Sequence, residues 1–224
     1  MHDKILHFPG MLRSAWHEAS PAMNPSTPSN EAPGSDPLAI FLEWHKTAVE
    51  RGLPEPDAFA LATATPDGQP SVRIVLFKGL ADGAVRLVTN YESRKGEELA
   101  KNAHGALVFF WPGLMRQVRM EGHLERAPTS ESDAYFRGRD RESQLGAWAS
   151  AQSRPVESRA ALLENLERVR ERFRDRDVPR PPHWGMLKLV PERVELWLAG
   201  EHRLHDRFVY TREGAGWRVE RLAP

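Results

Sequence analysis

The sequence predicts an α+β fold in which helices flank an antiparallel, barrel-like sheet. Three observations predict this class. Short segments with strand-type alternation fill residues 58–126, helical periodicity replaces them from 129 to about 174, and strand patterns return from 186 to the end. The regular strand–helix alternation of a parallel sheet does not occur. Nor do the glycine-rich motif of a Rossmann unit, a Walker sequence or a nucleophile elbow.

The chain is predicted to consist of an amino-terminal flexible arm and linker, residues 1–35, and one folded domain, residues 36–224. The linker is rich in Pro, Ser and Asn and offers few side chains to bury. Asp36 followed by Pro37 is typical of a helix start, and apolar residues then recur at helical spacing until Gly52. The first folded element is therefore expected to be a helix.

Short strands separated by turn residues are predicted next. The segments 58–65, 71–79 and 84–90 are joined by Pro-Asp-Gly and Ala-Asp-Gly turns, which is typical of an antiparallel meander. Two further strands, 105–111 and 116–126, are linked by a Pro-Gly pair and are expected to form a hairpin. Together these segments supply the first part of the sheet.

Helices are predicted from 129 to about 174. Between 156 and 173 the apolar residues recur on one stripe, so this face is expected to pack against another part of the molecule. The segment 179–185, PRPPHWG, ends the helical region. Strand patterns return in 186–198 and in a closing hairpin, 207–222.

The composition excludes several classes of protein. Lys plus Arg and Asp plus Glu balance at 31 each, so the chain lacks the basic excess of a general nucleic-acid or membrane-surface binder. The absence of cysteine excludes disulfides, thiolate metal sites and thiol nucleophiles. No apolar run approaches the ~20 residues that span a bilayer, and the first residues lack a secretory signal. We expect a cytoplasmic protein with no nucleic-acid or membrane partner.

The stretch ESRKGEELA, residues 92–100, is typical of a helix start, yet it places Arg94 and Lys95 in the first turn. The amino end of a helix already carries about half a positive charge, which disfavours cations there. In one interpretation Ser93 caps the helix and both cations point into solvent. In the other, a phosphate occupies the helix end. The local sequence leaves both open.

Two further segments place cations in strand patterns. Alternation along SVRIVLFK directs Arg73 and Lys78 to opposite faces; these cations either need anionic partners or mark an edge strand with solvated ends. If a strand runs from residue 203, then Arg203, His205 and Arg207 line one of its faces, an arrangement that suits a flat ligand.

Two other patterns concern a possible metal site and a helix face. His202 and His205 form an H-x-x-H pair, but on a strand they face opposite ways and no third ligand is evident, so no metal site is predicted. Tyr135, Arg139 and Ser143 recur every four residues. On a continuous helix they would form a polar stripe able to hold an anion, although the GRDR sequence between them is compatible with a break. A solvated helix face is the alternative.

Taken in order, five stretches resemble the pyridoxine (pyridoxamine) 5′-phosphate oxidase family: RIVLFKG, TNYESRKG, RQVRMEGHLER, SQLGAWAS with the following Gln-Ser, and E-x-W-x5-RLHDR through to LAP. The resemblance covers about residues 36–224. It implies an FMN-binding split β-barrel that forms a homodimer with FMN at the interface. The implied activity is oxidation of pyridoxamine or pyridoxine 5′-phosphate to pyridoxal 5′-phosphate. O2 would accept the electrons, giving H2O2, and the amine would also release ammonia.

The resemblance also implies residue roles. FMN would be bound by Arg73, Ile74, Val75, Leu76, Lys78, Val88, Thr89, Arg94, Lys95, Gln117, Gln152, Ser153, Trp197 and Arg207. The substrate would be bound by Lys78, Tyr135, Arg139, Ser143, Arg203 and His205. Arg203 and His205, the candidate catalytic residues, would hold the pyridine ring against the flavin. The anion in front of Ser93 would be the FMN phosphate.

The sequence departs from the family pattern in places. Val88 stands where Tyr is usual and Met186 replaces a familiar Gly, while Arg13 and Trp16 keep the spacing of an Arg–Tyr pair without its phenol. Two alternatives remain: a sibling flavin oxidase acting on another substrate, such as a phenazine precursor, and a non-catalytic flavin or pyridoxal phosphate binding protein. The retained basic residues favour the phosphorylated substrate, because another ligand would leave several cations unpaired.

Overall fold

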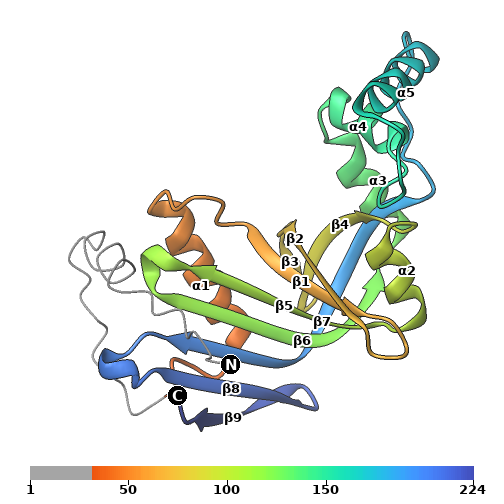
Figure 1. Ribbon diagram of the computed structural model, residues 1–224. Coiled ribbons are helices and arrows are strands. Elements are labelled where there is room, and N and C mark those ends of the chain that lie inside the picture. The colour runs from red at the N-terminus through yellow and green to blue at the C-terminus, as the bar shows by residue number, and fades with distance from the viewer. Residues whose placement is uncertain (1–31) are drawn as a thin grey trace, which may run out of the picture. The chain divides into compact units, whose positions relative to one another are not determined.

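The computed structural model describes residues 32–224 (Figure 1). Arg13 and Trp16 lie outside the described residues, and the arm boundary near residue 35 stays a prediction. The first helix, α1 (Pro37–Glu50), forms where the sequence predicts it. Asp36 caps it, since its Oδ1 accepts a hydrogen bond of 2.9 Å from the amide of Leu38. Its apolar face is buried in the main core.

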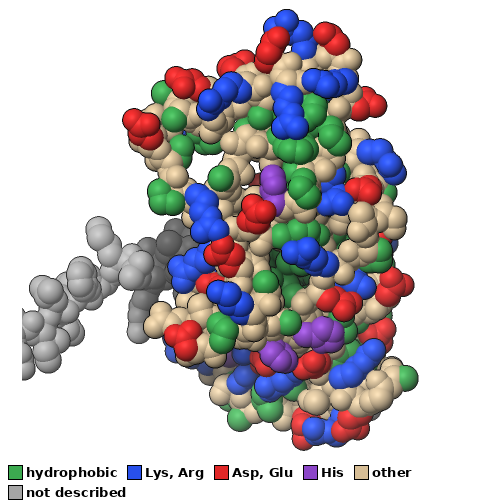
Figure 2. Space-filling view, turned by 90° about the vertical axis from the view of Figure 1, so that its right-hand side faces the viewer, with side chains coloured by type: hydrophobic (Ala, Val, Ile, Leu, Met, Phe, Trp, Pro, Cys, Tyr) green, Lys and Arg blue, Asp and Glu red, His purple; other side chains and the backbone are tan. Residues whose placement is uncertain are grey.

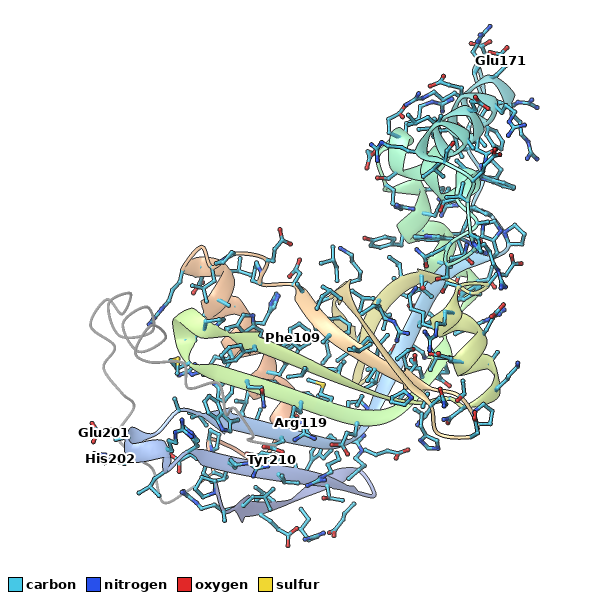
Figure 3. The ribbon with its side chains drawn as sticks, in the orientation of Figure 1. Phe109, Arg119, Glu171, Glu201, His202 and Tyr210 are labelled. Carbon is cyan, nitrogen blue, oxygen red and sulfur yellow. The ribbon has the colours of Figure 1, made fainter. Side chains whose placement is uncertain are left out.

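One antiparallel sheet makes up most of the described fold. Its strands are β1 (Ala58–Ala64), β2 (Pro70–Leu76), β3 (Leu80–Ala81), β4 (Ala84–Asn90), β5 (His104–Trp111), β6 (Arg116–Arg126), β7 (Trp184–Leu198), β8 (Asp206–Glu213) and β9 (Gly216–Leu222). The strand order is β2-β1-β5-β6-β7-β4-β3, and β8 pairs with β7 and β9. The main core contains Phe41, Phe59 and Phe109; Figure 3 labels Phe109. The predicted α+β class is confirmed.

The long strand β7 connects two parts of the sheet. One of its edges pairs with β6 along nearly its whole length. The other edge pairs first with β4, from Trp184 to Leu189, and then with β8, from Arg193 to Leu198. The β6–β7 register shifts at Gly122, where an added Cβ would lie 2.0 Å from the carbonyl oxygen of Val190. Only glycine fits this close approach.

The predicted meander is partly wrong. β1 and β2 form the expected hairpin, and so do β5 and β6, but β4 pairs with β3 and β7 and not with β2. β4 is buried along nearly its whole length, with Val85 and Leu87 fully inaccessible. A strand so enclosed belongs in the interior of a sheet, whereas β2 has an exposed row of side chains and lies at the edge.

Four more helices complete the described fold: α2 (Arg94–Lys101), α3 (Thr129–Arg137), α4 (Arg141–Ala149) and α5 (Arg159–Arg172). Figure 1 shows α3, α4 and α5 gathered at the Trp184 end of β7. A second, smaller core joins them around Phe136, Leu145, Phe173 and Trp184.

The predicted apolar stripe of 156–173 packs only in part. Leu166 and Val169 pack against the smaller core and Phe173 is buried within it. Val156 and Leu163, by contrast, are exposed. The stripe was expected to pack against another part of the molecule, and its second half does so, whereas Val156 lies before the start of α5.

Candidate functional site

A cavity of about 550 Å³ opens between β2, β4, the start of α2 and the segment around residue 152. Most of the residues expected to bind FMN line it: Arg73, Ile74, Val75, Leu76, Lys78, Val88, Thr89, Arg94, Lys95, Gln152 and Ser153. Asn90 and Trp184 also line it, although the sequence did not single them out. Segments far apart in the chain therefore meet at one hollow, which we call the β2–α2 cavity.

The start of α2 does not follow the simple capping interpretation. Ser93 is fully buried, and its Oγ donates to the carbonyl of Asn90 at 2.6 Å instead of capping the helix. Lys95 is only 8% exposed, and its Nζ donates to Ser93 Oγ at 3.1 Å and to Gln152 Oε1 at 2.8 Å. Both partners are neutral. Burial, together with repulsion from Arg73, lowers the pKa of Lys95 to about 8.

A buried carboxylate, Glu98, holds the arginines of this cavity. Its side chain is 4% exposed and accepts hydrogen bonds from Ser71 (2.6 Å), from Arg94 Nε (2.9 Å) and from Thr63. Arg73 Nη2 lies 3.5 Å from the same carboxylate. Burial opposes ionisation, but the hydrogen bonds from Ser71, Thr63 and Arg94 outweigh it and lower the pKa of Glu98 to about 2. Glu98 therefore stays ionised and orients both guanidinium groups.

Changing Glu98 to Gln is expected to lower the free energy of unfolding at neutral pH by about 3 kcal/mol, because the half-buried Arg73 loses its counter-charge and the buried carboxylate loses its hydrogen bonds from Ser71 and Thr63. The stabilisation is present above pH 4.5 and is lost as the pH falls through about 2. Urea unfolding of both proteins across this range measures the difference. Glu97→Gln, which alters an exposed ion pair on the same helix, should change stability far less. An equal effect of the two changes would contradict this role for Glu98.

Lys78 lies outside the strand on which alternation was argued. β2 ends at Leu76, so Lys78 lies in the following connection, where its amide donates to the carbonyl of Arg86 at 2.8 Å. Side-chain alternation holds only within a strand, so it does not determine the direction of Lys78. Both cations line the β2–α2 cavity.

The residues expected to bind the substrate phosphate lie beside the cavity wall formed by Trp184. Tyr135 stacks on this indole at a centroid distance of 6.2 Å, and the Arg139 guanidinium lies 4.7 Å from its ring centre. Arg139 Nη1 is buried and has no hydrogen-bond partner in residues 32–224. Burial also lowers the pKa of Arg139. An unpartnered buried guanidinium nitrogen is costly, which indicates a missing acceptor.

Tyr135, Arg139 and Ser143 do not share one helix. α3 ends at Arg137 and α4 starts at Arg141, so of the two possibilities left open by the sequence the chain adopts the break at GRDR, and a continuous stripe is not formed. Asp140 causes the second start, because its Oδ1 accepts from the Ser143 amide at 2.8 Å. Ser143 is half-buried in the first turn of α4.

The remaining residues expected to bind FMN, Gln117, Trp197 and Arg207, form a third group, which lies along the other half of β7. Gln117, Trp197 and Arg207 are register partners on three neighbouring strands and do not line the β2–α2 cavity. Arg207 Nε donates to the buried carboxylate of Glu195 at 2.8 Å. The extended backbone between Gly185, opposite Thr89, and Trp197 is on the order of 40 Å long. Within one chain, this group is therefore far from the cavity along the strand.

The candidate catalytic residues lie at the connection between β7 and β8, and the condition on which they would share a strand face, a strand from residue 203, is not met. Residues Glu201–Arg203 form a 3₁₀ turn, and β8 starts at Asp206. His202 and Arg203 adopt φ values of 53° and 65°, in the left-handed region. Because the chain turns here, Arg203, His205 and Arg207 do not share a strand face.

Residues 32–224 offer neither a metal-binding cluster nor a membrane-spanning helix. No group of three His, Cys, Asp or Glu side chains is placed to hold a metal ion. None of these residues forms a helix long and apolar enough to cross a membrane. On the face shown in Figure 2, acidic and basic side chains are interspersed.

Sequence and structure comparisons point to one family. Residues 46–173 match the model of the pyridoxamine 5′-phosphate oxidase family, and residues 184–224 match the pyridoxine 5′-phosphate oxidase C-terminal dimerisation region. The chain is 52% identical over 189 residues to a pyridoxine/pyridoxamine 5′-phosphate oxidase of Rubrobacter xylanophilus, covering 84% of this chain and 87% of the relative. It is 53% identical over 192 residues to the enzyme of that name from Salinibacter ruber, covering 84% and 89%.

Solved structures agree with the fold. PhzG from Burkholderia lata 383, in complex with tetrahydrophenazine-1-carboxylic acid, superposes with a TM-score of 0.82 at 32% identity, covering 88% of this chain and 97% of PhzG. A pyridoxamine 5′-phosphate oxidase-related, FMN binding protein from Nostoc punctiforme superposes with a TM-score of 0.67 at 19% identity, covering 85% and 100%, which supports the fold. The expected split-barrel architecture is confirmed. This chain belongs to the pyridoxamine 5′-phosphate oxidase family.

Proposed function

We propose that this chain is an FMN-dependent oxidase that converts pyridoxamine or pyridoxine 5′-phosphate to pyridoxal 5′-phosphate. O2 accepts the electrons and H2O2 is released, with ammonia as a further product of the amine. The observation that carries the proposal is a pair of basic side chains around the β2–α2 cavity, the buried Lys95 and the half-buried Arg139 with its buried Nη1 atom. Lys95 has only neutral partners, and Arg139 Nη1 has none within residues 32–224. The phosphate of the cofactor would supply an anionic partner for Lys95, and the phosphate of the substrate would supply one for Arg139.

The cofactor phosphate is assigned to Lys95, Arg94 and Arg73 at the start of α2. Charge-assisted hydrogen bonds to phosphate are about twice as strong as neutral ones, and the helix end adds its dipole. When bound, the flavin supplies the redox chemistry by accepting a hydride from the C4′ carbon and passing two electrons to O2. The protein supplies position: Glu98 holds both arginines in place, and apolar residues of β2 line the cavity beside them.

The substrate phosphate is assigned to Arg139, Tyr135, Ser143 and Lys78. The indole of Trp184 lies between the Arg139 group and the cavity, so a substrate bound to Arg139 would reach toward the cofactor. A ligand that offers no acceptor here would leave Arg139 Nη1 unsatisfied, and a phosphate supplies three acceptor oxygens.

We assign the complete site to a homodimer. Gln117, Trp197 and Arg207 do not line the β2–α2 cavity, and about 40 Å of extended β7 backbone separates the two groups. The edge strand β2, which borders the cavity, exposes Val72 (69%) and Ile74 (66%). Contiguous exposed apolar side chains are typical of a subunit interface. A second copy docked there would bring its own third group, with Arg203 and His205, to the first copy's cofactor.

A single assay tests the proposal. The purified protein is expected to show flavin absorbance and, with pyridoxamine 5′-phosphate in air, to form aldehyde and H2O2 together. A second candidate, a sibling flavin oxidase, is favoured by the similarity to PhzG in complex with tetrahydrophenazine-1-carboxylic acid. Turnover of a reduced phenazine carboxylate but not of either vitamer phosphate would support that candidate. Binding without any turnover would support a carrier.

FMN affinity is expected to fall as the pH rises above about 8. Lys95 has a pKa of about 8 in the free protein, and a bound phosphate favours its charged form, so above pH 8 binding must take up a proton. The loss approaches tenfold per pH unit until the pKa of the complex is reached. Flavin fluorescence titrations from pH 7 to 10 measure it. Lys95→Met should abolish this slope, whereas Lys101→Met, at the far end of α2, should retain it; a slope unchanged in Lys95→Met would contradict the assignment.

A further inference from the structure

The connection between β7 and β8 contains a contact that sets the chemistry of His205. The amide N–H of Gly200 donates to Nδ1 of His205 at 3.1 Å. We propose that Gly200 is a positioning residue that holds His205 in the tautomer protonated on Nε2, so that His205 offers the substrate a hydrogen-bond donor. The role toward substrate rests on the proposed function; the tautomer itself does not.

The direction of this hydrogen bond decides the tautomer. A backbone amide is always a donor, so the nitrogen that faces it must offer a lone pair. In a neutral imidazole one nitrogen accepts and the other carries the proton. With Nδ1 accepting from Gly200, the proton lies on Nε2. A neutral ring protonated on Nδ1 would set two N–H groups against each other.

The turn itself brings the amide to the ring. An added Cβ at Gly200 would lie 1.9 Å from the carbonyl oxygen of Leu204, so only glycine allows the backbone at residue 200 to approach the backbone at residue 204 this closely. His202 and Arg203 turn the chain in the left-handed region, and the Leu204 amide donates to the Glu201 carbonyl at 2.9 Å. Left-handed conformations outside glycine are uncommon and are concentrated at functional sites.

The His205 ring also contacts Trp197, and its Nε2 atom is left without a hydrogen-bond partner within residues 32–224. The His205 ring lies 4.6 Å from the Trp197 ring, tilted by 46°. Within residues 32–224, His205 makes no other hydrogen bond. Nε2–H is therefore the group left to meet a ligand, and its partner must be an acceptor, such as an oxygen substituent of a pyridine ring. His205 would orient that ring without acting as a base at Nε2.

Nitrogen spectroscopy tests the tautomer directly. In the full-length holoprotein labelled with ¹⁵N-histidine, the His205 signals, assigned by their loss in His205→Gln, are expected to show a protonated Nε2 and an unprotonated Nδ1 at a pH where the ring is neutral. Gly200→Ala should shift the ring toward a tautomer mixture. Gly216→Ala, at the start of β9 where an added Cβ would make only an ordinary contact of 3.9 Å with the Glu213 carbonyl oxygen, should leave the His205 signals unchanged. A His205 ring protonated mainly on Nδ1 in the unmodified protein would overturn the inference.

Paired substitutions test the role toward substrate. The amide of Gln places its NH2 near the position of Nε2, whereas that of Asn reaches only the position of Nδ1. We expect His205→Gln to keep kcat/KM within about tenfold and His205→Asn to lose about 100-fold. The reverse order would overturn the donor role. Complete absence of turnover in the unmodified protein would instead overturn the proposed function and would leave the nitrogen signals as they are.

Discussion

Arg203→Ala is expected to lower kcat by about 10³-fold while the protein keeps its flavin, the size of loss typical of removing one preorganised charged group from a reacting centre. Arg203 is exposed in the single chain and lies at the tip between β7 and β8, where Figure 3 labels the neighbouring Glu201 and His202. Its φ of 65° costs about 1–3 kcal/mol in a non-glycine residue, a cost that folded structures retain chiefly at functional positions.

The measurement for Arg203 combines steady-state kinetics with the flavin-to-protein absorbance ratio. Glu201→Ala is the matched control, because it removes an exposed charge from the same 3₁₀ turn. Normal turnover in Arg203→Ala would show that the assigned role is wrong. Loss of flavin along with activity would place Arg203 in the cofactor site and not against the substrate.

Arg139→Ala is expected to lower kcat/KM for pyridoxamine 5′-phosphate by about 100-fold, which corresponds to about 2.7 kcal/mol of lost charge-assisted binding. The loss should fall mainly on KM, because the phosphate is remote from the reacting carbon. Unphosphorylated pyridoxamine should be used about equally poorly by both proteins. Thermal stability should fall little, since the Nη1 atom of Arg139 is already desolvated without a partner in residues 32–224.

Arg137→Ala is the control for Arg139. Arg137 is exposed in the last turn of α3, so its removal should leave kcat/KM nearly unchanged. Equal losses in both variants would indicate a general electrostatic effect. An Arg139→Ala enzyme that retains full preference for the phosphorylated vitamer would contradict the assignment of the substrate phosphate to Arg139.

The local patterns of the sequence predict where helices and hairpins form better than they predict which distant strands pair in the sheet. Asp36 with Pro37 gives the start of α1, and the turn residues after β1 and β5 give both hairpins, because these signals act over a few residues. The pairing of β4 with β7 depends on residues nearly a hundred positions apart, which no local pattern encodes. The same limit applies near residue 203, where the alternating sequence suits a strand but the chain forms a 3₁₀ turn. The close approach of Gly200 to Leu204 accompanies this turn, and no local pattern encodes it.

The site shows a similar division. The cations at Arg73, Arg94 and Lys95 were visible as charges in unfavourable places, and the structure gathers them at one cavity. Glu98 was missed because its only local signal is the spacing of four residues from Arg94, which is common on solvated helices. Its buried hydrogen bonds come from β1 and β2, and these contacts exist only after folding. Glu195, which holds Arg207, was missed for the same reason.

The placement of site residues at the two ends of β7 has a genetic consequence. If each active centre takes the cations of α2 from one copy and Arg207 from the other, an allele damaged at Lys95 and an allele damaged at Arg207 are each inactive alone. Expressed in the same cell, they assemble mixed pairs in which one of the two centres inherits only intact residues. Two such alleles would complement each other, whereas two alleles that are both damaged at the β2–α2 cavity, or both damaged beside Trp197, would not.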